Sequence, residues 1–142
     1  MSLNLDALET SFDLIAPRGD ELMDVFYTRL FTAAPAVRPL FPATDLQRQK
    51  TMLLGTLVLL RRSLRDLDSI LPKLRELGAR HVGYGAQPEH YPVVAEALIA
   101  AMAAIAGPAW QSNHERAWRV ALATVAGAML EGANAANLET AA

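Results

Sequence analysis

The stretch LPKLRELGARHVGYG, residues 71–85, indicates the fold class of this chain. Its inward-facing positions recur every three or four residues. The series begins at Ile70, just before the stretch, and continues with Leu74, Leu77 and His81. This spacing places the four side chains on one face of an α-helix. Gly83 and Gly85 follow, and glycine commonly ends a helix. The stretch therefore predicts a helix that carries a histidine on its apolar face.

The same periodicity continues through the rest of the chain on both sides. The segments that show it are 5–15, 22–31, 53–64, 91–105 and 118–129. Pro35 and Pro39 allow only short helical turns, because proline lacks the N–H that a longer helix needs. Ser112 and Glu115 form a capping-box pattern for the last helix, which we expect to end near Gly132. No segment has sustained strand alternation, so we expect an all-α domain with about six main helices joined by short turns.

The length and composition narrow the classes of protein that this chain can be. Its 142 residues predict one domain, and a hydrophobic content of 52% predicts an ordered one. The chain has no cysteine, which excludes disulfides, thiolate metal sites and cysteine nucleophiles. Thirteen Lys and Arg against fifteen Asp and Glu give a net charge of −2. That balance predicts no binding to nucleic acid or to an acidic membrane.

The two ends of the chain and its longest apolar stretch lead to three further expectations. The first residues lack the basic and apolar regions of a signal peptide. The longest apolar stretch, 97–106, has about half of the ~20 residues that a membrane span needs. We therefore expect a cytoplasmic protein outside the membrane. We also expect residues 1–133 to form the domain and residues 134–142 to form a disordered tail.

Four residues on the predicted apolar faces are candidates for chemistry, and each also has a purely structural interpretation. His81 is either a buried histidine satisfied by a backbone carbonyl or a ligand of haem iron. Tyr27 lies among apolar residues, where its hydroxyl needs a partner, although a packed tyrosine is the commoner case. Gln49 and Leu53 are one helical turn apart on the same face, a pair that alone indicates little. No inward carboxylate pair, nucleophile elbow or phosphate-binding glycine loop accompanies them.

Several motifs together resemble one known family. They are VFYTRLF at 25–31, PxVRPLF at 35–41, LP…LGxRHxxYG at 71–85 and PxHYPxV at 88–94. In this order and spacing they are similar to a bacterial single-domain globin, of the group that resembles the haem domain of flavohaemoglobins. The helical layout matches that group as far as Gly132. The resemblance implies the globin fold, with helices in a three-on-three arrangement around a haem pocket, and haem b (iron protoporphyrin IX) as the cofactor.

The resemblance also implies a role for individual residues. His81 would be the proximal ligand of the iron, and Tyr27 would donate a hydrogen bond to a bound diatomic gas. Gln49 would assist Tyr27, with Gln47 as the alternative because the preceding loop is shorter than in the family pattern. The remaining residues would contact the haem or line its pocket, and they are Phe41, Leu53, Tyr91, Val94 and Leu98.

The function implied first is binding of O₂, as in oxygen transport, and of NO and CO. An alternative is an NO dioxygenase that relies on a separate reductase, since no flavin or nicotinamide domain is visible in this sequence. A third alternative is a haem-free globin-fold module that senses or docks a partner. One departure from the family weakens the enzymatic alternative. Its members have a glutamate late in the last helix, at the position of Ala133 here, and Glu131 lies about 200° away around a helix.

Overall fold

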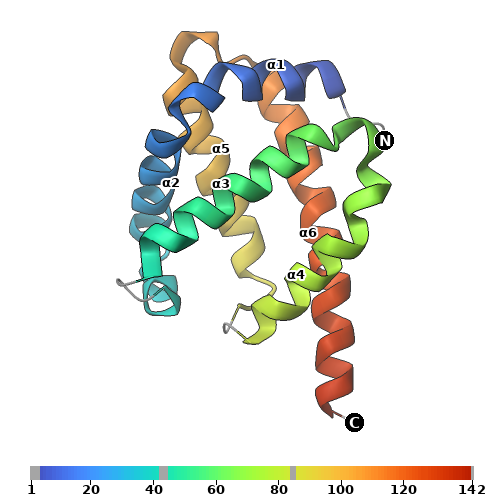
Figure 1. The fold of residues 1–142 in the computed structure, drawn as a ribbon. Coiled ribbons are helices and arrows are strands. Elements are labelled where there is room, and N and C mark those ends of the chain that lie inside the picture. The colour runs from blue at the N-terminus through green and yellow to red at the C-terminus, as the bar shows by residue number, and fades with distance from the viewer. Residues whose placement is uncertain (1–3, 42–44, 84–85, 142) are drawn as a thin grey trace.

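The computed structural model describes residues 4–41, 45–83 and 86–141, and within these ranges every regular element is helical. The α-helices are α1 (Leu5–Ile15), α2 (Gly19–Ala33), α3 (Leu46–Arg62), α4 (Leu71–Gly83), α5 (His90–Ala106) and α6 (Ser112–Ala141). Short 3₁₀ turns connect them, and they are η1 (Ala16–Arg18), η2 (Pro35–Leu40), η4 (Leu64–Ile70) and η5 (Gly107–Ala109). Figure 1 shows α3 crossing in front of α5. Helix α2 lies on the left of the view and α4 lies below α3. The predicted all-α class is confirmed.

Side chains cap the starts of α1 and α6, and the second of these caps differs from the expected one. At α1 the Asn4 side chain accepts a hydrogen bond from the backbone N–H of Ala7 at 3.1 Å. At α6 the reciprocal pair lies one residue earlier than the expected Ser112–Glu115 box. The Gln111 backbone N–H donates to His114 Nδ1 at 3.1 Å, while the Gln111 carbonyl accepts from the His114 N–H at 3.0 Å. An imidazole nitrogen thus does what a glutamate oxygen does in the usual box.

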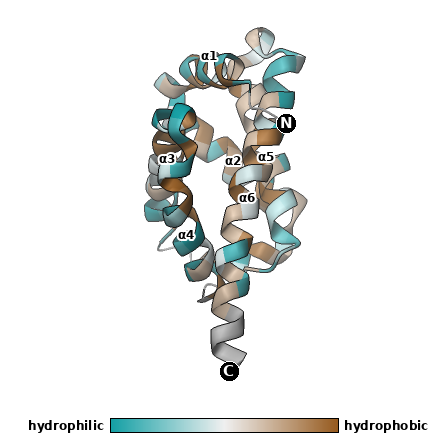
Figure 2. Cartoon of the chain, turned by 90° about the vertical axis from the view of Figure 1, so that its right-hand side faces the viewer, coloured by the Kyte–Doolittle hydropathy of each residue, from teal (hydrophilic) through white to brown (hydrophobic). Residues whose placement is uncertain are grey.

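Helix α5 forms the middle of the hydrophobic core. Its buried residues are Ala97, Leu98, Ile99, Ala101, Met102 and Ile105. Among the described residues, the segment His90–Ala109 is long and apolar enough to cross a membrane by length and composition, with a mean hydropathy of 1.7. This segment is longer than the stretch 97–106. That stretch was counted as uninterrupted apolar residues, whereas a mean hydropathy can include polar residues such as His90. Figure 2 shows this apolar helix among the others, and a third of its apolar window is buried within the protein.

Two glycines set the close approach of α4 to α6. A Cβ atom on Gly78 would lie 1.9 Å from the backbone oxygen of Met129, and a Cβ atom on Gly132 would lie 1.8 Å from that of Arg75. Real Cβ atoms essentially never come within 3.0 Å of another atom in this way. The two backbones therefore touch only because both residues lack a side chain. This contact positions the helix that carries His81.

Helix α6 is longer than the sequence predicted. It continues through Gly132 to Ala141, and Figures 1 and 2 both show its end extending past the other helices. Gly132 does not end the helix because it serves the contact with α4, and the following residues include good helix formers and no proline. The tail expected from residue 134 is therefore corrected to helix up to Ala141. The division of the chain at residue 133 stays a prediction.

Candidate ligand-binding site

His81 lies near the end of α4, half-buried, with its ring tied to the previous helical turn. Nδ1 is 2.7 Å from the carbonyl oxygen of Leu77. A carbonyl can only accept, so Nδ1 carries the hydrogen and donates it, and Nε2 of the neutral ring carries the lone pair. Burial lowers the pKa of His81, the Leu77 bond raises it by less, and the charge of Arg80 lowers it further. The ring is therefore in the form that binds a metal ion.

Tyr27 lies on the inner face of α2 and is only 4% exposed. Its ring contacts three phenylalanines, with centroids 4.8 Å from Phe26, 5.8 Å from Phe31 and 5.7 Å from Phe41. Burial raises the pKa of its phenol to about 12. Within residues 4–41, 45–83 and 86–141 the hydroxyl has no hydrogen-bond partner. Tyr27 is thus a neutral hydrogen-bond donor in an aromatic surrounding, and Phe41 from the end of η2 is part of that surrounding.

Helix α3 carries the two predicted companions of Tyr27. Gln49 and Leu53 are both half-buried, whereas Gln47 is exposed. The helix is linked to α2 by an ion pair in which Lys50 Nζ is 2.9 Å from Asp24 Oδ1. Gln49 therefore turns further inward than Gln47, the alternative that the sequence left open.

Helix α5 carries three predicted site residues on one stripe. Tyr91 and Val94 are half-buried, and Leu98 is fully buried. Burial raises the pKa of the Tyr91 phenol. Steps of three and four residues keep these side chains on one face of the helix. Tyr84 and Gly85, which belong to the sequence motif before this helix, lie outside the described residues.

The predicted residues fall into two groups on different helices. Tyr27, Phe41, Gln49 and Leu53 come from α2, η2 and α3, and the first two are in direct ring contact. His81, Tyr91, Val94 and Leu98 come from α4 and α5. In the part of the chain that the structure describes, no hydrogen bond or ring contact joins one group to the other. The arrangement offers one metal-binding nitrogen on α4 and one buried hydroxyl donor on α2.

Glu131, the acid of α6 that lies two residues before Ala133, faces the surface. Glu131 is exposed, and its carboxylate accepts a hydrogen bond from Arg75 Nε at 3.0 Å. Ala133, at the family's glutamate position, is buried. The Glu131 side chain thus serves a surface ion pair between α6 and α4. No group of three His, Cys, Asp or Glu side chains suited to a metal ion occurs among the described residues.

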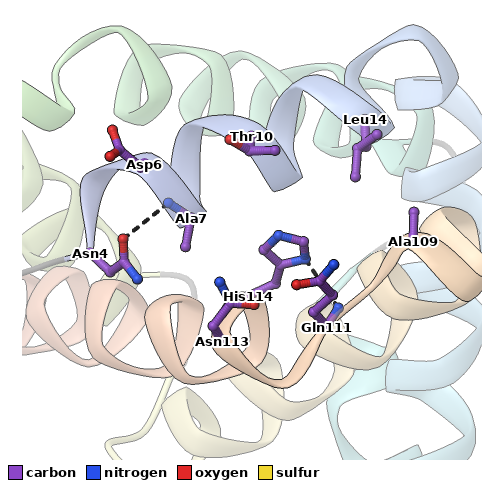
Figure 3. A pocket seen from close by; sticks show the side chains of 9 residues that line it. All are labelled: Asn4, Asp6, Ala7, Thr10, Leu14, Ala109, Gln111, Asn113 and His114. Carbon is purple, nitrogen blue, oxygen red and sulfur yellow. Dashed lines mark hydrogen bonds between the residues drawn. The ribbon is translucent and has the colours of Figure 1, made fainter.

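A separate cavity of about 460 Å³ lies between α1 and the start of α6 (Figure 3). Its lining includes His114, whose Nδ1 is already used to cap α6. His90 closes the turn that precedes α5, since its Nδ1 accepts from the Gln87 N–H at 3.0 Å. None of the predicted site residues is among those that line this cavity. Both histidines therefore have structural tasks away from the candidate site.

Sequence reasoning missed two contributors to the site. One is the contact between Gly78 and Gly132, for which two glycines inside helical patterns were the available signal. The other is the ion pair between Lys50 and Asp24. Nothing in the sequence signals that pair, because the two residues lie on helices whose relative placement spacing alone does not give.

Comparison with known proteins places these observations in a family. The family model named Globin matches residues 24–129. A flavohemoprotein of Bacillus subtilis (strain 168) is 25% identical over 128 residues, covering 89% of this chain and 32% of the relative. The chain thus spans about a third of the length of that curated relative.

Two solved structures have the same fold. One is a bacterial globin from Campylobacter jejuni, with a TM-score of 0.80 and 21% identity, covering 92% of this chain and 94% of the other. The second is an engineered carbene transferase made from a protein of Rhodothermus marinus that is described as a putative nitric oxide dioxygenase. It has a TM-score of 0.89 and 22% identity, and the match covers 100% of both chains.

Proposed function

The chain belongs to the globin family, and we propose that it is a haem protein that binds O₂ and also NO and CO. In this proposal the cofactor is haem b, and His81 is the ligand of its iron. Tyr27 and Gln49 are the hydrogen-bonding residues on the other side of the pocket. The apolar contacts come from Phe41, Leu53, Tyr91, Val94 and Leu98. The relatives named flavohemoprotein support the cofactor.

The chemistry of His81 fits an iron ligand. The ring is held by its hydrogen bond to the Leu77 carbonyl, so it has a defined orientation before any metal binds. Its lowered pKa keeps it neutral, and only the neutral ring has a nitrogen lone pair for a metal. When bound there, a haem supplies the iron atom to which a diatomic gas binds.

The observation that carries the proposal is Tyr27, a residue only 4% exposed whose hydroxyl has no hydrogen-bond partner within the described residues. This hydroxyl is kept neutral here, since its phenol pKa is about 12. A gas ligand that accumulates negative charge accepts a hydrogen bond from it. Hydrogen bonds to charged groups contribute about 1.5–3 kcal/mol, which is about tenfold to a hundredfold in the dissociation rate.

The NO dioxygenase alternative draws on the names of the relatives. That reaction joins NO and O₂ with one electron to give nitrate, so every turnover needs a reductant. A separate reductase would be the partner, and we propose the cytoplasm as the place where both would act. The surface position of Glu131 and the buried Ala133 favour gas binding over this catalysis.

The test is the absorption spectrum of the haem-reconstituted protein, reduced with dithionite and then exposed to CO. We expect a sharp Soret band that shifts with CO. His81→Ala should lose the band and regain it with added imidazole, while the matched control His90→Ala should keep it. A protein that takes up no haem refutes the proposal and leaves the haem-free interaction module. A band that survives His81→Ala without imidazole removes His81 as the ligand.

The same preparation separates the two haem functions. Tyr27→Phe should release O₂ about tenfold to a hundredfold faster, because it keeps the ring and removes the donor. An unchanged release rate would take Tyr27 out of the site. Sustained NO consumption with NADH and a generic reductase would favour the dioxygenase.

A further inference from the structure

We propose that Lys50 is a positioning residue, whose ion pair with Asp24 holds the first half of α3, and with it Gln49, against α2. The inference rests on the proposed function, because it assigns Gln49 to the gas-binding side of the site. It concerns a salt bridge on the surface of the domain.

The two halves of α3 are attached to the domain in different ways. Its fully buried residues are Leu57 and Leu60, both in the second half. From Leu46 to Thr56 every described residue is half-buried or exposed. Leu46, Leu53 and Leu54 pack against the core but are only partly buried, so this half gains less from the hydrophobic effect than the second half and opens at a smaller free-energy cost. The half that carries Gln49 is therefore the less firmly attached one.

The second half also has ion pairs to α1. Arg61 bonds Asp13 at 3.1 Å and Glu9 at 3.3 Å, each measured from a guanidinium nitrogen to a carboxylate oxygen. Arg65, in the turn after α3, bonds Glu9 at 2.7 Å. These pairs add to the buried leucines, so this end of α3 has several independent attachments.

The first half has two specific contacts with α2. Leu54 lies over Gly19, where a Cβ atom would be 3.0 Å from the Leu54 Cδ2 atom. Lys50 Nζ lies 2.9 Å from Asp24 Oδ1. The Lys50 side chain is only 21% exposed, so its stem lies along the protein while its charge reaches Asp24, whose side chain is 67% exposed. Of the two contacts, the ion pair is the one nearer to Gln49.

The ion pair connects both hydrogen-bonding residues of the proposed site. Asp24 precedes Tyr27 by three positions on α2, which is about one helical turn. Lys50 directly follows Gln49 on α3. Breaking the pair therefore frees Gln49 relative to Tyr27 without touching either side chain. Exposed ion pairs change equilibria by up to about fivefold, so the expected effects are about twofold to fivefold.

The first experiment uses the haem-free protein and measures amide hydrogen exchange by mass spectrometry. Asp24→Asn and Lys50→Met should each speed exchange in residues 46–54 by about twofold to fivefold. The charge-swapped double variant, Asp24→Lys with Lys50→Glu, should restore the slow exchange. The matched control is Glu96→Gln, which breaks the pair between Arg119 on α6 and Glu96 on α5 and should leave residues 46–54 unchanged. Unchanged exchange in the Asp24 and Lys50 variants overturns the inference, whether or not haem binds.

The second experiment measures O₂ dissociation from the haem-loaded protein at low and high salt. Both single variants should release O₂ about twofold to fivefold faster than the wild type at low salt. Salt should raise the wild-type rate towards theirs, because it screens the pair, and should leave theirs unchanged. Faster exchange with unaltered O₂ release would mean that the pair is only structural, which also overturns the inference. A wild-type protein that binds no haem refutes the proposed function, while the exchange experiment still decides whether Lys50 anchors α3.

Discussion

The contact between α4 and α6 can be tested by adding one methyl group, in the variant Gly78→Ala. The new Cβ atom would lie 1.9 Å from the backbone oxygen of Met129. An ordinary contact begins at 3.4 Å, so the two helices must separate locally by about 1.5 Å. The new Cβ atom is fixed directly to the backbone of α4, and the atom that it meets is a backbone oxygen of α6. No flexible side chain can therefore turn away to relieve the clash. His81 lies three positions further along the same helix and moves with it.

The expected magnitude is the difference between two opposing effects. Overpacking a tight contact costs about 1–3 kcal/mol, and a displacement of backbone on both sides belongs at the upper end of that range. Replacing glycine by alanine inside a helix stabilises it by about 1 kcal/mol. We therefore expect Gly78→Ala to lower the free energy of unfolding by about 2 kcal/mol. For a chain of this size that lowers Tm by about 4–8 °C.

The assay is urea unfolding followed by circular dichroism, with Gly127→Ala as the matched control. Gly127 lies on α6, and a Cβ atom there would meet nothing within 4 Å. That control should be about 0.4–1 kcal/mol more stable than the wild type. The alanine lowers the conformational entropy of the unfolded chain and causes no clash in the folded protein. The dependence of the unfolding free energy on urea concentration should have the same slope in the variants as in the wild type. An unchanged slope would show that only the stability has changed.

A Gly78→Ala protein as stable as the Gly127→Ala control would refute the reasoning. The double variant with Gly132→Ala gives a further check. The Gly132 clash is with the backbone oxygen of Arg75 at 1.8 Å, across the same pair of helices. One separation of the helices relieves both clashes, so the double variant should lose clearly less stability than the two single losses combined.

Three further predictions concern the core, acid stability and the site. Ser11→Ala removes the acceptor of a 2.8 Å hydrogen bond from Trp118 Nε1 and should cost about 1–3 kcal/mol in urea unfolding, and a loss below about 0.5 kcal/mol would contradict it. The hydrogen bond from Arg65 holds the pKa of Glu9 below its ordinary 4.5, so its contribution is present above that pH and is lost below it. Wild type should therefore melt above Glu9→Gln at neutral pH, and the difference should shrink as the pH falls below 4.5. Ultraviolet titration should find one tyrosine with a pKa of about 12 that is absent in Tyr27→Phe, and identical curves would show that Tyr27 is not buried as described.

Much of the fold is predictable from the sequence because helical periodicity is a local property. Residues three and four positions apart share a face wherever a helix forms, which is why His81 could be assigned to an apolar face together with Leu77. Tyr27 could be placed among aromatic neighbours by the same rule. The lack of a hydrogen-bond partner for the Tyr27 hydroxyl could not be predicted, because it depends on every helix that packs around this side chain.

The errors occurred where a residue's role depends on its neighbours in space. Gly132 was interpreted as the end of a helix, since glycine commonly ends one, yet the close approach of Arg75 uses it inside α6. Helix α6 starts at Ser112, but its capping pair was assigned to Ser112 and Glu115. The structure instead uses His114, because an imidazole nitrogen can also accept the backbone N–H of a capping position.

Spacing along the chain was therefore enough to predict an all-α protein and to put His81 and Tyr27 on apolar faces, while the resemblance to globins came from the motifs at 25–31, 35–41, 71–85 and 88–94. The tertiary structure alone decided that α4 touches α6 through two glycines and that Lys50 reaches Asp24. It also placed Glu131 on the surface beside Arg75. The physical reason is range: helix formation and the facing of side chains depend on residues within one turn, whereas backbone clashes and ion pairs between helices depend on where distant segments meet.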